Sequence, residues 1–320
     1  MSSASPSPRL PAAVALSGAV VVGMMTAIQA RINGELGLRL DDGLVAAAIS
    51  FGSGLLLLIA LSAALPAGRR GFRALVSGVR ERSIPWWMLA GGAAGALTVA
   101  TQGLAVAVIG VSLFTVGVVA GQTVNGLVLD RAGYGPAGVV AVTVPRLIGG
   151  ALALVAVGVS LQGDVLQRIP LWMLLLPLVA GVGIAWQQAT NGRLRQRVGT
   201  PLTATLVNFI GGTILLFAAA VVSVLWRGAP DVVPTEPWLY VGGAIGVFYI
   251  FLSAALVVHT GVLLLGLGTV AGQLLTALVI DVVWPASSGP GWAVELLMVT
   301  VALASVVVAA APWRARRARS

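Results

Sequence analysis

The stretch QARINGELGLRLDDGLVAAAISFGSG, residues 29–54, aligns without gaps with QQATNGRLRQRVGTPLTATLVNFIGG, residues 187–212, at an offset of 187 − 29 = 158. A second ungapped block has an offset of 238 − 87 = 151. The two blocks match Gln29 with Gln187, Asn33 with Asn191, Phe51 with Phe209, Gly91 with Gly242, Gly95 with Gly246, Gln122 with Gln273 and Asp130 with Asp281. Self-similarity over this length indicates an internal duplication.

The composition indicates that lipid surrounds most of the folded chain. Hydrophobic residues make up 58% of the 320 residues, and charged residues make up 9%. A soluble domain usually carries roughly a quarter charged residues, so this chain has too little polar surface to cover a water-soluble globule.

Ten segments are long and apolar enough to cross a hydrocarbon core of ~30 Å, which takes about 17–25 residues of helix. They cover residues 11–32, 43–65, 85–106, 110–129, 140–161, 171–190, 201–225, 238–258, 262–281 and 292–311. The division between the third and fourth segments depends on Ile109-Gly110 alone. The equivalent residue in the duplication, Gly261, divides the eighth segment from the ninth.

The distribution of arginine predicts the orientation of these segments. With a cytoplasmic N-terminus, the inside segments hold 14 of the 19 basic residues, the outside loops hold 4, and Arg146 lies in a span. Because cytoplasmic loops of membrane proteins are enriched in Arg and Lys, both termini are expected in the cytoplasm.

Each copy of the duplication contains five predicted helices, so the second copy enters the membrane from the opposite side. The expected fold is therefore an all-α integral membrane protein with ten transmembrane helices in two inverted five-helix repeats, an arrangement typical of secondary transporters. The predicted boundaries are a short cytoplasmic N-terminus (1–10), the first repeat (11–162), the inverted second repeat (163–312) and an Arg-rich cytoplasmic tail (313–320).

Several other classes of protein do not fit the sequence. The net charge of +9 comes from short arginine clusters between apolar spans and not from a basic face on a soluble fold, so nucleic acid is not an expected partner. The chain has no Cys and one His, His259, which argues against a metal site, and no cofactor is expected. There is no phosphate-binding loop or nucleophile motif, so the protein is not expected to be an enzyme.

The repeated pattern Q-x-x-x-N-G-x-L…SFxxG, followed by W-x-x-x-GGxxG and AGQ…xxD, resembles the YdcZ family of the drug/metabolite transporter (DMT) superfamily. The resemblance covers nearly the whole chain and corresponds to the fused ten-helix form of a five-helix unit. It implies an exporter of small molecules in the bacterial inner (plasma) membrane, with a cavity formed mainly by helices 1, 3, 4, 6, 8 and 9.

Polar side chains at mid-depth are the candidate lining of that cavity, because such groups are costly in lipid and face a bundle interior. The predicted substrate-binding residues are Gln29, Gln102, Gln122, Trp186, Gln187, Gln188, Tyr249 and Gln273. The amides could equally serve as hydrogen bonds between helices. Asn33, Asn191, Phe51, Phe209, Gly91, Gly95, Gly242 and Gly246 are interpreted as structural residues of the repeat.

Charged residues narrow the choice of solute. In the small multidrug-resistance branch of the superfamily that the chain resembles, a Glu deep in the first helix exchanges protons for cationic drugs. The first helix here has no carboxylate at mid-depth, which argues against that type of exchange and favours a neutral or zwitterionic solute. Arg146 lies either inside a span or, with Pro145 in the first turn of a shorter helix, at the cytoplasmic interface. Asp130 and Asp281 are expected to cap turns or helices.

The leading functional hypothesis is a secondary transporter with a small-molecule solute and the lipid bilayer as its partners. The alternatives are a non-transporting subunit of a membrane complex and a passive channel. The sequence leaves the oligomeric state open, a homo-oligomer included.

Overall fold

The computed structural model describes residues 12–310 except 136–137, 140 and 161–164. These residues form helices and loops without a β-strand, which confirms the all-α class. The helices are α1 (Ala12–Arg39), α2 (Gly43–Ala64), α3 (Pro66–Arg80), η1 (Trp86–Leu89), α4 (Gly91–Ile109), α5 (Val111–Arg131), α6 (Val144–Ser160), α7 (Val165–Arg168), α8 (Leu171–Val198), α9 (Pro201–Arg227), η2 (Pro237–Tyr240), α10 (Gly242–Val283) and α11 (Trp292–Ala310). The predicted N-terminal segment and the Arg-rich tail lie outside the described residues.

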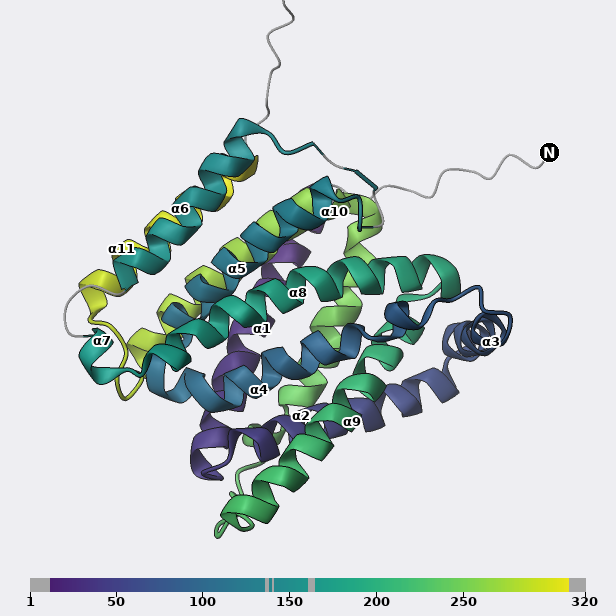
Figure 1. Ribbon diagram of the computed structural model, residues 1–320, viewed down its shortest axis with the longest axis horizontal. Coiled ribbons are helices and arrows are strands. Elements are labelled where there is room, and N and C mark those ends of the chain that lie inside the picture. The colour runs from purple at the N-terminus through teal and green to yellow at the C-terminus, as the bar shows by residue number, and fades with distance from the viewer. Residues whose placement is uncertain (1–11, 136–137, 140, 161–164, 311–320) are drawn as a thin grey trace, which may run out of the picture.

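Most long helices run side by side in one bundle, with α1 between α2, α4 and α10, and with α6 and α11 paired at one edge (Figure 1). Within the described ranges, 6 helices are long and apolar enough to cross a membrane. Shorter apolar stretches cover Val144–Val159, Gly242–Ser253 and Gly268–Val283. The chain is therefore a multi-pass membrane protein, and the count of ten spans stays a prediction.

The first helix is longer than predicted. It ends at Arg39 and not at residue 32, so Arg31, assigned from sequence to an outside loop, lies within α1 and is 4% exposed. Arg31, Glu35 and Arg39 are spaced four residues apart, and Glu35 forms ion pairs with both arginines at 3.6 and 2.9 Å. Pairs at this spacing stabilise a helix, whereas a hydropathy window ends at the first charges.

The break predicted at Gly261 is wrong as secondary structure, because α10 is helical from Gly242 to Val283. Its contacts nevertheless run along α1 and back again. In four pairs a glycine lies so close to its partner that an added β-carbon would crowd it: Gly242 with Asn33, Gly246 with Gln29, Gly18 with Leu256, and Gly23 with Thr269. At the end of α10, the Trp284 ring centroid lies 4.2 Å from Arg31. A straight helix rises ~1.5 Å per residue and cannot return to the same end of α1. The stretches Gly242–Ser253 and Gly268–Val283 of α10 therefore run in opposite directions along α1, and the α10 ribbon turns in Figure 1.

The predicted break at Gly110 is confirmed. Helix α4 ends at Ile109 and α5 begins at Val111, with Gly110 at φ 87°. Such a backbone conformation strongly favours glycine. Asp281 accepts hydrogen bonds from the backbone N–H groups of Val111 and Ser112 at 2.9 and 2.6 Å, which gives it the capping role expected from sequence.

Two segments that contain arginine differ from or refine the predicted structure. The Arg-rich segment after α2 contains the additional helix α3, which was not predicted. Helix α6 begins at Val144, so Arg146 lies in its first turn, where it pairs with Asp130 at 2.8 Å. The start at Val144 matches the shorter helix with Pro145 in its first turn, one of the two arrangements that the sequence left open.

Candidate functional site

A stacked pair of phenylalanine rings lies where α2 crosses α9. The ring centroids of Phe51 and Phe209 are 4.7 Å apart with 25° between the planes, and both side chains are buried. A β-carbon at Gly54 would collide with the Phe209 ring, and one at Gly212 would collide with the Phe51 ring. The close crossing of the two helices therefore requires both glycines.

One set of amides lies on the α1 side of this ring pair. Gln29 Nε2 donates to the Gly242 carbonyl at 2.8 Å, and Asn33 Nδ2 donates to Gln102 Oε1 at 2.7 Å. All three side chains are buried, so these bonds form away from water. A β-carbon at Gly246 would lie 2.5 Å from Gln29 Nε2 and 3.5 Å from Phe209 Cζ. Gly246 thus brings the Gln29 amide up to the phenylalanine pair.

A second set of amides lies on the α8 side. Gln187 Nε2 donates to Asn208 Oδ1 at 3.1 Å. A β-carbon at Gly95 would lie 2.6 Å from Gln187 Nε2, 2.9 Å from Asn208 Oδ1 and 3.1 Å from Phe51 Cζ, and one at Gly91 would collide with Asn191 Oδ1. Gly95 therefore brings the second set up to the Phe51 ring.

Some polar atoms of these two sets have no protein partner among the described residues. Gln29 Oε1, Asn33 Oδ1, Ser50 Oγ and Asn208 Nδ2 are buried without a hydrogen bond. Buried polar groups are normally paired, so these four atoms have hydrogen-bonding capacity that the described protein residues do not use. Asn208 was not among the predicted site residues, and its position one residue before Phe209 is the sequence signal that could have included it.

Not all predicted residues belong to this centre. Gln122 and Gln273 lie at other crossings, where a β-carbon at Gly181 would lie 2.8 Å from Gln122 N and one at Gly23 would lie 2.6 Å from Gln273 N. Gln188 is exposed, next to the half-buried Gln187.

The two predicted aromatic residues form none of the hydrogen bonds within the amide sets. Trp186 Nε1 donates to Tyr134 Oη at 3.1 Å, and that hydroxyl lies 3.2 Å from Thr190 Oγ1. Trp186 therefore joins α8 to the segment after α5. Tyr249 is half-buried on α10, three residues after Gly246.

A charged cluster at one end of the bundle was missed by the sequence analysis. Arg31 lies over the Trp284 ring and pairs with Glu35, and its Nε and Nη1 atoms have no hydrogen-bond partner in the described ranges. Asp281 adds an attractive charge to Arg31 from α10. The four-residue spacing of Arg31, Glu35 and Arg39 is the sequence signal that would have extended α1 and buried Arg31.

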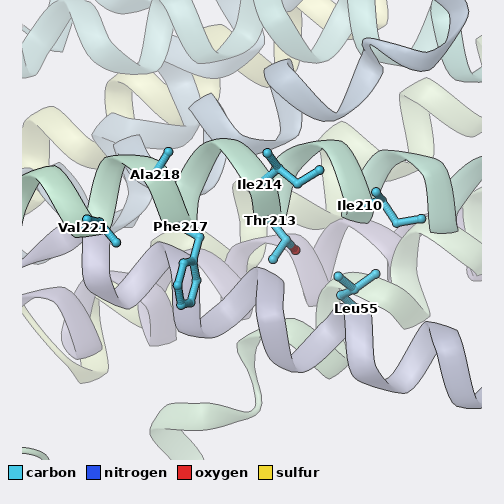
Figure 2. Close-up of a pocket in the computed structure, with 7 residues that line it drawn as sticks. All are labelled: Leu55, Ile210, Thr213, Ile214, Phe217, Ala218 and Val221. Carbon is cyan, nitrogen blue, oxygen red and sulfur yellow. The ribbon is translucent and has the colours of Figure 1, made fainter.

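The bundle surface also carries an apolar groove between α2 and α9, of about 590 Å³ (Figure 2). Its lining residues are Leu55, Ile210, Thr213, Ile214, Phe217, Ala218 and Val221. Ile214 and Phe217 are 65% and 64% exposed, as expected for side chains that face lipid acyl chains. The groove is thus part of the outer surface and separate from the amide sets.

Comparison with known proteins identifies the family. No curated protein matched the chain in a sequence search. The family described as "Putative inner membrane exporter, YdcZ" matches residues 14–160 and 172–309. These two segments cover most of the described chain, including both amide sets and the phenylalanine pair. The chain therefore belongs to the YdcZ family of inner membrane exporters.

Proposed function

We propose that this protein is a secondary transporter that exports a small solute across the bacterial inner membrane by alternating access between two inverted halves. The proposal depends mainly on one observation, which is that the contacts around the Phe51–Phe209 pair occur twice. The equivalent contacts are Gly95 with Gln187 and Gly246 with Gln29, Gly91 with Asn191 and Gly242 with Asn33, and Gly54 with Phe209 and Gly212 with Phe51.

The duplication extends beyond the centre. Gly121 closely approaches the Leu178 carbonyl as Gly272 approaches that of Val20, and η1 and η2 occupy equivalent positions 151 residues apart (237 − 86 = 151). The two segments matched by the family model, 14–160 and 172–309, fall within the predicted repeats. These correspondences support two halves related by a pseudo-two-fold axis. Solute sites of transporters with inverted repeats lie at the interface of the repeats.

Exposed tryptophans mark the two membrane interfaces, and arginine supports the orientation with both termini in the cytoplasm. Trp172, Trp226 and Trp292 are 51%, 88% and 56% exposed at the start of α8, the end of α9 and the start of α11. Trp86, 79% exposed, lies at the other end, near the Arg-rich segments after α2 and in α8. Tryptophan is enriched at both membrane interfaces, and arginine on the cytoplasmic side.

The chemistry of the centre favours a neutral or zwitterionic solute. Amide and hydroxyl groups with both acceptors and donors available surround two aromatic rings, and the pairs described above place no carboxylate or guanidinium among them. A solute with an apolar body and a few hydrogen-bonding groups would satisfy Gln29 Oε1, Asn33 Oδ1 and Asn208 Nδ2. Such a solute would supply the hydrogen-bond partners of these buried atoms, and a few precisely placed polar groups give a site its specificity.

The proposal is tested by solute flux in proteoliposomes that contain the full chain. A panel of neutral, zwitterionic, anionic and cationic metabolites is screened first, and saturable flux of at least one is expected. Gln187→Ala should then raise the KM for that solute by about fivefold, since the loss of one hydrogen bond to a polar solute costs about 1 kcal/mol. Gln188→Ala, one residue further and exposed, is the matched control and should leave KM unchanged.

Stability separates a site effect from misfolding. Gln187 is half-buried and bonds only to Asn208, so the Gln187→Ala variant should keep the thermal unfolding midpoint of the wild type within a few degrees. Absence of flux for the whole panel would refute the transporter assignment. Equal KM values for Gln187→Ala and Gln188→Ala would leave the family assignment intact but refute the site.

A further inference from the structure

The helix α3 lies crosswise at one end of the bundle. In Figure 1 it is viewed nearly end-on, whereas α2 and α9 beside it run across the picture. It follows α2 directly, and Arg69 Nη1 donates to the carbonyls of Ala63 and Ala64 at 2.7 and 2.9 Å. A helix at the end of a spanning segment and across the bundle lies in the plane of the membrane surface.

One face of α3 is docked on the protein. Gly68, Gly71, Leu75 and Gly78 are its buried residues. A β-carbon at Gly71 would collide with Thr200 and Thr203 at the start of α9, and Leu75 packs in a cluster with Leu194 and Val198 of α8. The glycines therefore let α3 lie directly against the bundle, which fixes the directions in which its other faces point.

A second face of α3 is apolar and uncovered. Leu65, Phe72 and Val79 are spaced seven residues apart and are 44%, 46% and 44% exposed. Residues seven apart lie on one side of a helix, so the three form a stripe beside the docked face. Its position at the end of a lipid-embedded helix makes the boundary between head groups and acyl chains the expected surroundings.

The third face is basic. Between Pro66 and Ser83 the chain has five arginines and one glutamate, a net charge of 5 − 1 = +4. None of these arginines forms an ion pair in the part of the chain that the structure describes. Arg69, Arg73 and Arg80 lie four and seven residues apart, on the side of the apolar stripe that is turned away from the protein. Long basic side chains in such a row reach the phosphate layer next to the buried stripe.

From this arrangement we propose that α3 is an interfacial helix that binds anionic phospholipid on the cytoplasmic leaflet, with Arg73 and Arg80 on the head-group phosphates and Phe72 and Val79 among the upper acyl chains. The evidence is the coincidence of three faces on one helix, each with a different environment. An arginine row that served only to orient the protein would need no exposed apolar stripe beside it. This inference is independent of the transported solute.

The test titrates the purified full chain in detergent with phosphatidylglycerol or phosphatidylcholine and counts bound lipids by native mass spectrometry. The wild type should prefer phosphatidylglycerol. The double variant Arg73→Gln/Arg80→Gln should weaken phosphatidylglycerol binding by about fivefold per arginine, which is the effect expected of one basic residue near an anionic surface. The variant Arg73→Lys/Arg80→Lys should keep most of the preference.

The matched control is Arg195→Gln/Arg197→Gln, which removes the same charge from the end of α8, where the three-faced arrangement of α3 is missing. It should change the preference less than the α3 variant does. Phe72→Ser/Val79→Ser should weaken both lipids alike, and unchanged unfolding midpoints verify that all variants fold. The proposal is overturned if the wild type shows no preference, if Arg73→Gln/Arg80→Gln retains it, or if the α8 control loses it equally.

Discussion

The carboxylate of Asp281 offers a sharp test of how the two halves differ. It caps the start of α5 through the N–H groups of Val111 and Ser112 and is 4% exposed. Its equivalent, Asp130, pairs instead with Arg146, and these two side chains are 31% and 25% exposed. Replacing each by Asn removes the same charge from the same position of the repeat, in two different environments.

The two substitutions should lower the free energy of unfolding by amounts that differ severalfold. Asp281→Asn keeps one carbonyl oxygen but turns an NH₂ group toward an N–H donor, so one hydrogen bond to a charged acceptor, worth about 1.5–3 kcal/mol, is lost. Arg31 also loses an attractive charge while it stays buried, which brings the total to about 3–5 kcal/mol. Asp130→Asn weakens a partly exposed ion pair and should cost about 1 kcal/mol at most.

Thermal unfolding of the full chain in detergent, followed by tryptophan fluorescence, measures the difference. With about 2 °C per kcal/mol for a chain of this size, Asp281→Asn should lower the midpoint by roughly 6–10 °C and Asp130→Asn by about 2 °C. Equal shifts for the two variants would refute the capping of α5 by Asp281.

Three further predictions concern substitutions at the helix contacts, and two of them compare a pair of positions. Gly272→Ala should prevent accumulation of folded protein, because its β-carbon would collide with the Val20 carbonyl. Gly52→Ala has open space around it and should stabilise α2 by about 0.5–1 kcal/mol. Size-exclusion profiles of fluorescent fusions compare the two variants. Gly110→Ala and Gly228→Ala impose the same backbone strain of about 1–3 kcal/mol, because the two glycines have φ 87° and 90°. A β-carbon at Gly110 would also lie 3.1 Å from Asp281 Oδ2, whereas one at Gly228 would meet open space. The unfolding midpoint of Gly110→Ala should therefore fall further, and equal losses would contradict this. Trp186→Phe should lower stability by about 1 kcal/mol through loss of the bond to Tyr134 and leave the KM for the solute unchanged; a changed KM would return Trp186 to the solute site.

The pairs of glutamine and glycine around the Phe51–Phe209 rings could be found from sequence because they occur in both copies of the repeat. The repeat matched Gln29 with Gln187 and Gly95 with Gly246 before any geometry was known, and the structure brings each glutamine to the glycine of the opposite half. The break at Gly110 was predictable from one glycine between apolar runs. The repeat could not predict which residue each amide bonds to, because equivalent positions share a backbone environment but not the side chains that surround them.

Two kinds of error have a common cause, which is that hydropathy measures depth along a helix and not direction around it. Gln122 and Gln273 have the depth of the site, but they lie at other helix crossings. Arg31 was assigned to a loop because a charge ended the apolar run, although the ion pairs with Glu35 carry the helix to Arg39. Local side-chain spacing would have corrected the second error, whereas the first needed the packing of the whole bundle.

The positions at which the two halves differ follow from the same packing. The four central glycines Gly91, Gly95, Gly242 and Gly246 each contact an amide of the opposite half, so a change at one of them disturbs a contact between the halves. At the ends, the residues equivalent to Arg31 and Glu35 are Ala189 and Arg193, and Arg193 lies instead over the rings of Trp87 and Tyr134 at 5.6 and 5.3 Å. A symmetric pair of halves would give the two access states equal free energy. If the protein alternates access as proposed, the ion pair of Arg31 with Glu35 and the charge of Asp281 at one end, set against the contacts of Arg193 with Trp87 and Tyr134 at the other, would determine the difference in free energy between the two states.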